Sequence, residues 1–433
     1  MRFYTTQHRF YCGIDLHART MHLCILAQDG NVVLDRNLPC DFPSLLQAIA
    51  PFRDGIDIGV ECMFGWYWLA DRCADHDIPF VVGHALYMKL IHGAKAKNDR
   101  IDANKIARLL KGGNFPLSYA YPKGMRETRD LLRRRMYLVH KRAELITHLE
   151  ILNAQNNLPP FGKKLAYAAN RAELDIPQRF ADPSVQLSVT VDLDLIDKLD
   201  ELIAKVELHL TRTAKVDDVQ TFHRLRTIPG VGPILALVLL YEMHQVERFD
   251  NVGQFLSYAR LAPCDHESAG KKLGSGGKKI GNAHLRWAFG EIACLFLRGS
   301  ERAKQWKQKQ EKKHGTAKAL AILAARLARA VYFMLRKEEA FDEERFFTGQ
   351  AKPVLAPTSP TKPAAAAGQA KPAPTKSTKQ DAADRQAKSP AAPTRSVRPA
   401  AAKEQAKSSP APTSPSKPAA CRGGRRRVAT TSP

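Results

Sequence analysis

Two aspartates, Asp99 and Asp102, lie in the basic stretch AKAKNDRIDANKIARLL, residues 94–110. Side chains three positions apart share one face of a helix, so both carboxylates would project together from a helix here. The ordinary interpretation is a solvated helix whose aspartates pair with nearby lysines. The interpretation we favour is that the two carboxylates hold metal ions against a phosphate group. The neighbouring cations Lys97 and Arg100 would then contact the phosphate backbone of a nucleic acid.

Two more acidic residues lie where a charge is costly. Asp15 interrupts the apolar segment FYCGIDLH, and Glu61 ends the apolar segment GIDIGVE. A buried carboxylate needs an ion-pair partner or a metal ion. If the two segments are neighbouring strands flanked by the helix of Asp99 and Asp102, all four acids meet in one pocket. Four anions in one pocket repel each other and raise each other's pKa, unless divalent cations lie between them.

Such a pocket would have a definite chemistry. Two Mg²⁺ ions about 4 Å apart would relieve the repulsion and clamp the attacking and leaving oxygens of a phosphodiester. Mn²⁺ could take the place of Mg²⁺. Taken singly, an aspartate on a strand or a helix is usually solvated or salt-bridged, so the hypothesis depends on the four acids occurring together.

The charge of the chain favours a polyanionic partner. Its 433 residues include 67 Lys or Arg and 43 Asp or Glu, which gives a formal net charge of +24. Residues 351–433 hold 16 Lys or Arg against 3 Asp or Glu, so residues 1–350 still carry +11. Nucleic acid is the simplest such partner, and an acidic membrane surface is the alternative. No apolar run approaches the length that a bilayer requires, and the first residues lack a signal-peptide core, so we expect no membrane attachment and a cytoplasmic, nucleoid-associated protein.

The eight cysteines show no CxxC pair or other metal-ligand spacing. They lie mostly in apolar segments, as the buried free thiols of a reducing compartment do. The sequence therefore argues against a zinc site.

The elements that must position the acids begin with strands. A meander of three antiparallel strands precedes a buried fourth strand, a helix and a short fifth strand. This order is typical of an RNase H-like α/β fold. Two histidines, His17 and His22, are expected on the strand surface. The predicted strands cover residues 10–17, 20–28, 31–39, 55–63 and 78–84, and the helix before the last strand covers residues 65–77.

Two long helices follow, and both show coiled-coil spacing. The first covers residues 123–157 and the second residues 191–213, and the prolines between them exclude a continuous helix. We favour an antiparallel helical stalk over two ordinary bundle helices. The basic face around Arg133–Arg135 would be a solvated surface. The proposed seams consist of Leu131, Leu138, Leu145 and Leu152 in the first helix, and of Leu195, Leu199, Leu202, Val206 and His209 in the second.

The rest of the ordered chain is expected to be mainly helical. The segment IPGVGP interrupts an apolar helix, and Gly230 and Gly232 would let backbone N–H groups approach a phosphate, as in a helix-hairpin-helix module. The alternative is a tight turn between helices that buries Val231. A last helix covers about residues 316–338. From about residue 351 the chain is rich in Pro, Ala, Lys, Ser and Thr, and is expected to be disordered.

These motifs together resemble those of the DEDD-type insertion-sequence transposases of the IS one-ten group, which are described as bridge-RNA-guided recombinases. The resemblance covers nearly all of residues 10–340 and rests on GIDLHARTMHLCIL, VECMFGWYWLA, KNDRIDANKIARLL, IPGVGPILA and RLAPCDHESAGKKLGSGGKKIGNAHLRWA. The first three segments look like the RuvC-like nuclease half of that family, and the last two look like its C-terminal transposase half. The resemblance implies that the D-E-D-D positions are Asp15, Glu61, Asp99 and Asp102.

The resemblance also implies a nucleophilic serine in the C-terminal half. The segment APCDHESAGKK places Ser268 there, with Ala269 between it and Gly270, and Ser275 in LGSGGKK is the competing candidate. By the residues alone, a serine in a loop rich in Gly and Lys is most often a turn residue. In the chemistry that the family implies, Ser268 forms a transient phosphoserine bond in a composite centre with the acidic metal site, within one subunit or between two.

The resemblance sets the expected organisation as well. Residues 1–118 would form a RuvC-like nuclease domain, residues 119–215 a helical coiled-coil stalk, residues 216–345 a C-terminal transposase domain, and residues 346–433 a disordered basic tail. The expected partners are the DNA of the element ends and of the target, a structured guide RNA, and further copies of the chain in a dimer or tetramer. The expected nucleic-acid contacts involve Lys97, Arg100, Gly230, Gly232, Lys278, Lys279, Asn282 and Arg286. For the basic face around Arg133–Arg135, the resemblance implies contact with RNA as the alternative to a solvated surface.

We therefore expect a transposase or site-specific DNA recombinase that cleaves and rejoins strands with Mg²⁺ and a serine nucleophile. Two other functions fit the residues. A RuvC-type endonuclease would hydrolyse DNA junctions with water, and would need the acids but not Ser268. A nucleic-acid-binding protein with an inactive site would bind with strong salt dependence and never cleave.

Overall fold

The computed structural model describes residues 2–63, 65–91, 98–213, 218–263, 266–268, 271–274 and 280–348. All of them belong to the first of two units of the chain, Met1–Leu355 and Ala356–Pro433. The predicted site residues Lys97, Ser275, Lys278 and Lys279 lie outside the described residues, and so does the predicted tail beyond residue 348.

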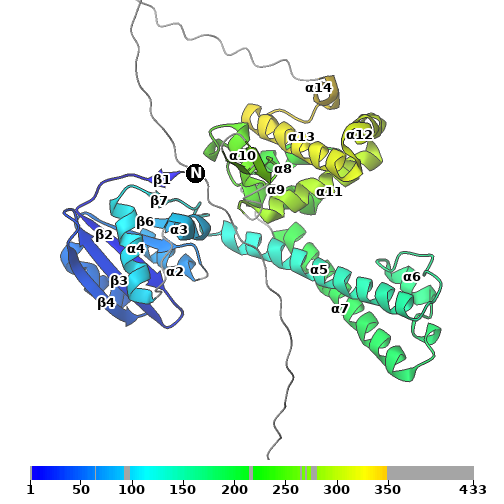
Figure 1. Ribbon diagram of the computed structural model, residues 1–433, viewed down its shortest axis with the longest axis horizontal. Coiled ribbons are helices and arrows are strands. Elements are labelled where there is room, and N and C mark those ends of the chain that lie inside the picture. The colour runs from blue at the N-terminus through cyan, green and yellow to red at the C-terminus, as the bar shows by residue number, and fades with distance from the viewer. Residues whose placement is uncertain are drawn as a thin grey trace, which may run out of the picture. The chain divides into compact units, whose positions relative to one another are not determined.

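The N-terminal part is built on a mixed sheet of five strands (Figure 1): β2 (Phe10–Leu16), β3 (Thr20–Ala27), β4 (Val32–Pro39), β5 (Ile56–Glu61) and β6 (Phe80–Gly83). Their spatial order is β4-β3-β2-β5-β6. β2, β3 and β4 form an antiparallel meander, whereas β5 pairs in parallel with both β2 and β6. The predicted meander and the two strands after it are confirmed.

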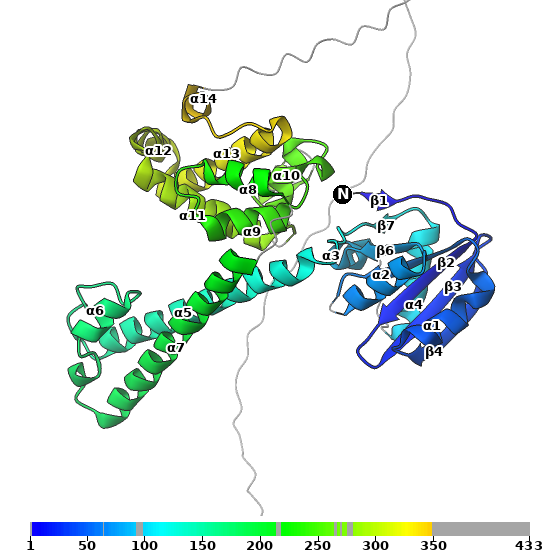
Figure 2. The same cartoon turned by 180° about the vertical axis from the view of Figure 1, so that it is seen from behind.

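Helices cover both faces of this sheet (Figures 1 and 2): α1 (Phe42–Ile49), α2 (Trp66–Asp75) and α4 (Asp99–Lys111). α1 and α2 share one core with Ile14 and Val60 of the strands. α4 shares a separate core with Tyr11. Because side chains alternate between the two faces along a strand, Asp15 and Glu61 lie on the face that α4 covers.

A pair of glycines lets α4 lie directly on the sheet. Gly13 of β2 and Gly59 of β5 are neighbours in the parallel register. A Cβ atom on Gly13 would lie 2.2 Å from the carbonyl oxygen of Ala103, and one on Gly59 would lie 2.6 Å from Cδ1 of Leu110. Only glycine therefore permits this approach, which fixes the distance between α4 and the strands that carry Asp15 and Glu61.

The two long helices α5 (Met125–Gln155) and α7 (Pro183–Thr213) pack side by side in opposite directions (Figure 1). Ion pairs between them join Arg135 to Glu207, Arg142 to Asp200 and His148 to Asp192. As the residue number rises along α5, the residue number of the ion-pair partner on α7 falls. The two helices are therefore antiparallel, as predicted. The connection between the helices contains the short helices α6 (Ala168–Glu173) and η2 (Pro177–Arg179).

The buried seam of α7 differs from the predicted one. Buried side chains recur every seven residues, at Val189, Ile196, Ile203 and Leu210. Leu195, which was expected in the seam, is 48% exposed. The helix also begins at Pro183 and not at residue 191, because proline is accommodated in the first turn of a helix. The predicted period was right, and Leu199, Leu202 and Val206 of the predicted seam are half-buried. The fully buried positions lie one residue after Leu195, Leu202 and His209, since isoleucine buries as much apolar surface as leucine does.

The C-terminal part is mainly helical, and its central helix α9 is buried from Leu235 to Met243. The turn before α9 buries Val231. The helices of this part are α8 (Val219–Arg226), α9 (Pro233–Met243), η3 (Val246–Arg248), α10 (Val252–Tyr258), α11 (Ala283–Gly299), α12 (Glu301–His314), α13 (Thr316–Lys337) and α14 (Glu343–Thr348). Between α10 and α11, β8 (His266–Ser268) and β9 (Lys271–Gly274) form an antiparallel hairpin.

The shorter elements of the N-terminal part are β1 (Phe3–Tyr4), η1 (Ala50–Phe52), α3 (Ala85–Ile91) and β7 (Phe115–Pro116), and β1 pairs with β7. Within the described ranges, no helix has both the length and the apolar character needed to cross a bilayer.

Candidate metal centre

Asp99 and Asp102 begin α4, where the local sequence favours acids. The side-chain oxygen of Asn98 accepts a hydrogen bond from the Ile101 N–H at 2.8 Å and so caps the helix. Both aspartates lie in the first helical turn. Unpaired N–H groups and the helix dipole stabilise negative charge at this end of a helix.

Asp15 and Glu61 lie at the ends of neighbouring parallel strands. The register of β2 and β5 runs to the pair Ile14 and Val60, and each acid directly follows one of these residues. The predicted adjacency of the first and fourth strands is therefore confirmed. Both acids are half-buried at one edge of the sheet.

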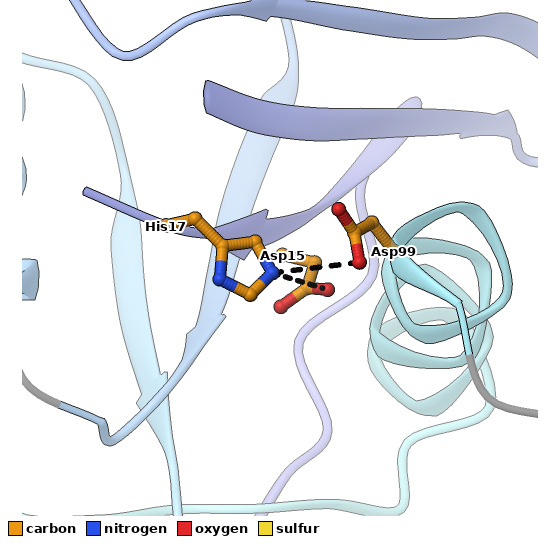
Figure 3. Close-up of side chains that lie close together, drawn as sticks. All are labelled: Asp15, His17 and Asp99. Atoms are coloured by element: carbon orange, nitrogen blue, oxygen red, sulfur yellow. Dashed lines mark ion pairs between the residues drawn. The ribbon is translucent and has the colours of Figure 1, made fainter. Parts of the chain in front are cut away.

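The imidazole of His17 connects the strand to the helix. Its Nε2 lies 3.4 Å from Oδ2 of Asp15 and 3.5 Å from Oδ1 of Asp99 (Figure 3). One ligand atom from each of the three residues lies within 4.8 Å of the others. His17 is exposed, as expected of a surface residue, but it directly follows β2 and contacts two candidate metal ligands, which was not predicted. Its position two residues after Asp15, on the same face of the chain, was the signal that could have placed it here.

The other two predicted ligands are less closely placed. This cluster of three contains neither Asp102 nor Glu61, although the structure describes both residues. Oδ1 of Asp102 lies 3.0 Å from Nζ of Lys105. Asp102 is nevertheless near enough for its charge to act on Asp15. The convergence of all four acids on one pair of metal ions stays a prediction.

The electrostatics of the cluster favour a bound cation. Burial raises the pKa of the Asp15 carboxyl group, and the charges of Asp99 and Asp102 raise it further, whereas His17 lowers it. A positive charge beside Asp15 would therefore favour its ionised form. A divalent cation between Asp15 and Asp99 would supply that charge.

The donor set fits a divalent ion. Carboxylate oxygens from Asp15 and Asp99 are the ligands that Mg²⁺ and Mn²⁺ prefer, and an imidazole nitrogen is acceptable to Mn²⁺. The Asp15 side chain is 18% exposed and that of Asp99 is 54% exposed, so one side of the cluster is open to solvent and to a substrate.

The predicted phosphate contact Arg100 pairs within the protein. Its Nε lies 2.6 Å from Oδ2 of Asp35 on β4. The same aspartate binds His22, whose Nε2 lies 2.7 Å from Oδ1. His22 is thus not the solvated strand residue that was expected, because its side chain is largely covered and ion-paired.

Ser268 is the last residue of β8 and is exposed. Its neighbour across the hairpin is Lys271, which is also exposed. Ser268 therefore lies opposite a lysine in the pairing of the two strands. The role of Ser268 as a nucleophile stays a prediction.

The remaining predicted contacts lie around α9 and α11. Gly230 has φ of +86°, and a Cβ atom there would lie 2.7 Å from Cβ of Leu295, so this glycine serves the turn and its packing against α11. Gly232 precedes α9 and has open space around it. Asn282 is 7% exposed and caps α11. Arg286 is exposed on α11.

The basic face of α5 is only partly solvated, because Arg134 is exposed whereas Arg133 and Arg135 form ion pairs within the protein. Arg133 donates to the buried carboxylate of Glu242, with Nε 2.7 Å from Oε1. Arg135 binds Glu207 of α7, with Nη2 2.6 Å from Oε1. The sequence pattern suggested free cations because acids distant along the chain pair with them only in the folded protein.

Comparison with known proteins identifies both halves of the chain. A transposase model of the DEDD IS110 type matches residues 12–152, and the model of the transposase IS116/IS110/IS902 family matches residues 222–308. The chain is 24% identical over 340 residues to the transposase for insertion sequence element IS1111A of Coxiella burnetii, which covers 76% of this chain and 90% of that protein. It is 22% identical over 349 residues to the transposase for insertion sequence element IS1328 of Yersinia enterocolitica, which covers 76% of this chain and 98% of that protein.

The two matches cover different parts of the fold. The first contains the sheet, α4 and the acidic cluster, and the second contains α9, the hairpin with Ser268 and α11. A domain of the DEDD type, together with the acidic cluster, indicates the use of a divalent metal. The chain is therefore similar in both parts to transposases of the IS110/IS116 type, and these matches indicate a DNA transposase or recombinase.

Proposed function

We propose that the protein cleaves and rejoins DNA strands with a divalent cation held by its acids and with Ser268 as the nucleophile. The observation that carries this proposal is the meeting of Asp15 and Asp99, distant in sequence, around the imidazole of His17. A structural ion pair would need only one carboxylate, whereas two carboxylates on one side of an open cluster favour a cation and a phosphate.

The acids would hold the metal. Asp15, Glu61, Asp99 and Asp102 are the proposed ligands of Mg²⁺, with two ions in the complete site and Mn²⁺ as a substitute. Such ions polarise a phosphodiester and stabilise the charge that develops on it. His17, between two of the acids, would keep their carboxylates in place.

Ser268 would hold the cleaved DNA strand through a covalent bond. Its hydroxyl oxygen forms a bond to phosphorus and gives up its proton, while the bond from phosphorus to a sugar oxygen breaks and that oxygen takes up a proton. A sugar hydroxyl of the second strand then reverses the step and frees the serine. Because the number of phosphoester bonds stays constant, rejoining needs no external energy source.

The surface of the C-terminal part suits a nucleic acid. α12 contains Arg302 and five lysines against two glutamates, and Lys309, Lys312 and Lys313 are exposed. Such cations bind phosphates irrespective of sequence. We extend the proposal to a structured guide RNA, to a dimer or tetramer, and to a cytoplasmic, nucleoid-associated location.

Two substitutions separate the proposal from its rivals. Asp99→Asn is expected to lower DNA cleavage by at least about 100-fold and to leave DNA affinity nearly unchanged, because it removes a metal ligand and no phosphate contact. The control is Asp75→Asn, at an exposed acid that ends α2. Full cleavage by Asp99→Asn would refute the metal role.

The second substitution tests the serine. Ser268→Ala is expected to abolish both strand exchange and the covalent protein–DNA adduct seen on denaturing gels. Ser188→Ala, at an exposed serine of α7, is the matched control. Strand cleavage that continues without an adduct would instead favour the endonuclease that uses water.

A further inference from the structure

A buried carboxylate joins α5 to the C-terminal helices. The side chain of Glu242, near the end of α9, is 1% exposed. Its oxygens accept hydrogen bonds from Nε of Arg129 at 3.0 Å, from Nε and Nη2 of Arg133 at 2.7 and 3.0 Å, and from Nδ2 of Asn282 at 2.7 Å. Burial by itself would raise the pKa of Glu242, but the hydrogen bond from Arg133 and the charges of both arginines hold it at about 2. The carboxylate is therefore ionised and fully engaged.

Asn282 uses every polar atom of its side chain inside the protein. Its Oδ1 accepts hydrogen bonds from the N–H groups of His284 and Leu285 and so caps α11. Its Nδ2 donates to Glu242 and lies 3.3 Å from the hydroxyl of Tyr258. The Asn282 side chain is thus held between the start of α11 and Glu242 of α9.

Asn282 also closes the base of the segment that carries Ser268. The backbone N–H of Asn282 donates to the carbonyl of Tyr258 at 2.5 Å, and Nε of Arg260 donates to the carbonyl of Gly281 at 2.8 Å. Gly281 has φ of +98°, and a Cβ atom there would lie 2.6 Å from the same Tyr258 carbonyl. We call Tyr258, Arg260, Gly281 and Asn282 the neck, because they hold together the two ends of residues 259–281.

We propose that Glu242 and Asn282 are positioning residues for Ser268. The neck fixes where the serine-bearing segment leaves the helical core, and Glu242 ties the neck to α5 through Arg129 and Arg133. Holding the two ends of a segment together reduces the conformations that it can adopt. Because a misplacement of about 1 Å can cost about 100-fold in rate, loss of the tie should slow the chemical step. This inference rests on the proposed role of Ser268.

The test is a substitution that removes the tie and keeps the helix cap. Serine caps a helix as well as asparagine does but has no amide to donate to Glu242. In the full-length protein, Asn282→Ser is expected to slow single-turnover formation of the protein–DNA adduct by at least about 10-fold and to change DNA affinity by less than about twofold. Asn251→Ser is the matched control, because Asn251 caps α10 by accepting from the Gln254 N–H. It should leave both quantities within about twofold.

Asn282→Asp is the second variant. It keeps the cap, and places a second carboxylate where the amide donated to Glu242, so it should slow adduct formation at least as much as Asn282→Ser. Melting temperatures of all variants show that the protein is folded. A purely structural role would affect affinity and rate together, whereas a positioning role affects the rate.

The outcomes separate this inference from the proposed function. If Asn282→Ser and Asn282→Asp form the adduct as fast as Asn251→Ser while Ser268→Ala forms none, the positioning role is wrong and the serine mechanism stands. If Ser268→Ala itself still forms the adduct, the proposed function fails, and the positioning role fails with it.

Discussion

Two carboxylates beside each other at the end of a buried strand must be compensated. In the structure, Nε2 of His17 lies 3.4 Å from Oδ2 of Asp15 and 3.5 Å from Oδ1 of Asp99. A protonated imidazole can offset only one negative charge, whereas a divalent cation can offset two. The residue-scale interpretation is therefore that His17 keeps the carboxylates together and that the cation completes the site.

A second buried acid, Asp57, is separate from this site and makes stability depend on pH. Asp57 lies on β5 and is 0% exposed. Among the described residues, neither of its carboxylate oxygens accepts a hydrogen bond of normal geometry. Tyr4 is near enough to lower the pKa of Asp57, but by less than burial raises it. Burial raises the pKa of Asp57 to about 6. Below about pH 6 the folded protein therefore holds Asp57 protonated, and the stability linked to the protonated form is greatest below about pH 4 and is lost as the pH rises through about 6.

Asp57→Asn removes this titration. We measure the free energy of unfolding of the variant and of the natural protein by urea unfolding at pH 4 and at pH 7. The variant's value minus that of the natural protein is expected to be about 1–3 kcal/mol larger at pH 7 than at pH 4. The difference between the two pH values cancels any constant cost of the amide. Asp75→Asn, at an exposed position, should show no such gain. Parallel pH profiles for Asp57→Asn and the natural protein would refute the account.

Of the candidate metal ligands, the sequence revealed those whose type conflicts with their surroundings. Asp15 and Glu61 interrupt or end apolar strands, and Asp99 and Asp102 share a helix face. His17 carries no such conflict, and its role depends on how close α4 comes to β2. The ion pair of Arg100 with Asp35 was not predicted for the same reason, because Asp35 lies far away in the sequence, and the phosphate contact of Arg100 stays a prediction.

At the scale of elements, the glycine pair under α4 positions the acids. Gly13→Ala would place Cβ 2.2 Å from the Ala103 carbonyl oxygen, so α4 would have to move away from β2. We expect a loss of about 1–3 kcal/mol in the free energy of unfolding, with weaker binding of Mn²⁺, because Asp99 moves with the helix.

Gly290→Ala is the control for this substitution. Gly290 lies in α11, and a Cβ atom there would meet nothing within 4 Å. Alanine in a helix should leave stability unchanged or raise it by up to about 1 kcal/mol. If Gly13→Ala proved as stable as Gly290→Ala and bound Mn²⁺ equally well, close packing would not be what positions the acids.

The types and limits of most elements could be predicted, and their packing could not. Alternation of apolar residues predicted the five strands to within a few residues, and the seven-residue period predicted α5 and α7. The phase of α7 was missed because Ile196 and Leu195 are equally apolar, so the choice between them depends on how α7 lies on α5. The Glu242 network was missed because Arg129, Arg133 and Asn282 come from distant segments.

At the scale of the whole molecule, α5 connects the two parts that carry the chemistry. Arg126 of α5 binds Asp71 of α2 at 2.9 Å, and Arg129 and Arg133 bind Glu242 of α9. The described contacts thus link α5 both to the part with the acids and to the part with Ser268. The domain limits at residues 118 and 215 stay predictions.

A mixing experiment tests whether the centre is shared between subunits. Asp99→Asn and Ser268→Ala are each expected to be inactive. If one subunit supplies the acids and its partner the serine, an equal mixture of the two variants in a dimer should recover roughly a quarter of the strand exchange of the natural protein. Recovery of strand exchange requires that the two variants exchange subunits. Mass photometry of chains with tags of different size can verify that exchange. A mixture that exchanges subunits and stays inactive would place acids and serine of one centre in the same chain.

The central claim is that Asp15 and Asp99 hold a divalent cation. The most direct measurement is anomalous diffraction from crystals of the full-length protein with DNA, soaked in Mn²⁺. The account predicts an anomalous peak about 2.0–2.6 Å from carboxylate oxygens of Asp15 and Asp99, and its loss in Asp99→Asn. No peak there, in protein that cleaves DNA when Mn²⁺ is added, would contradict it.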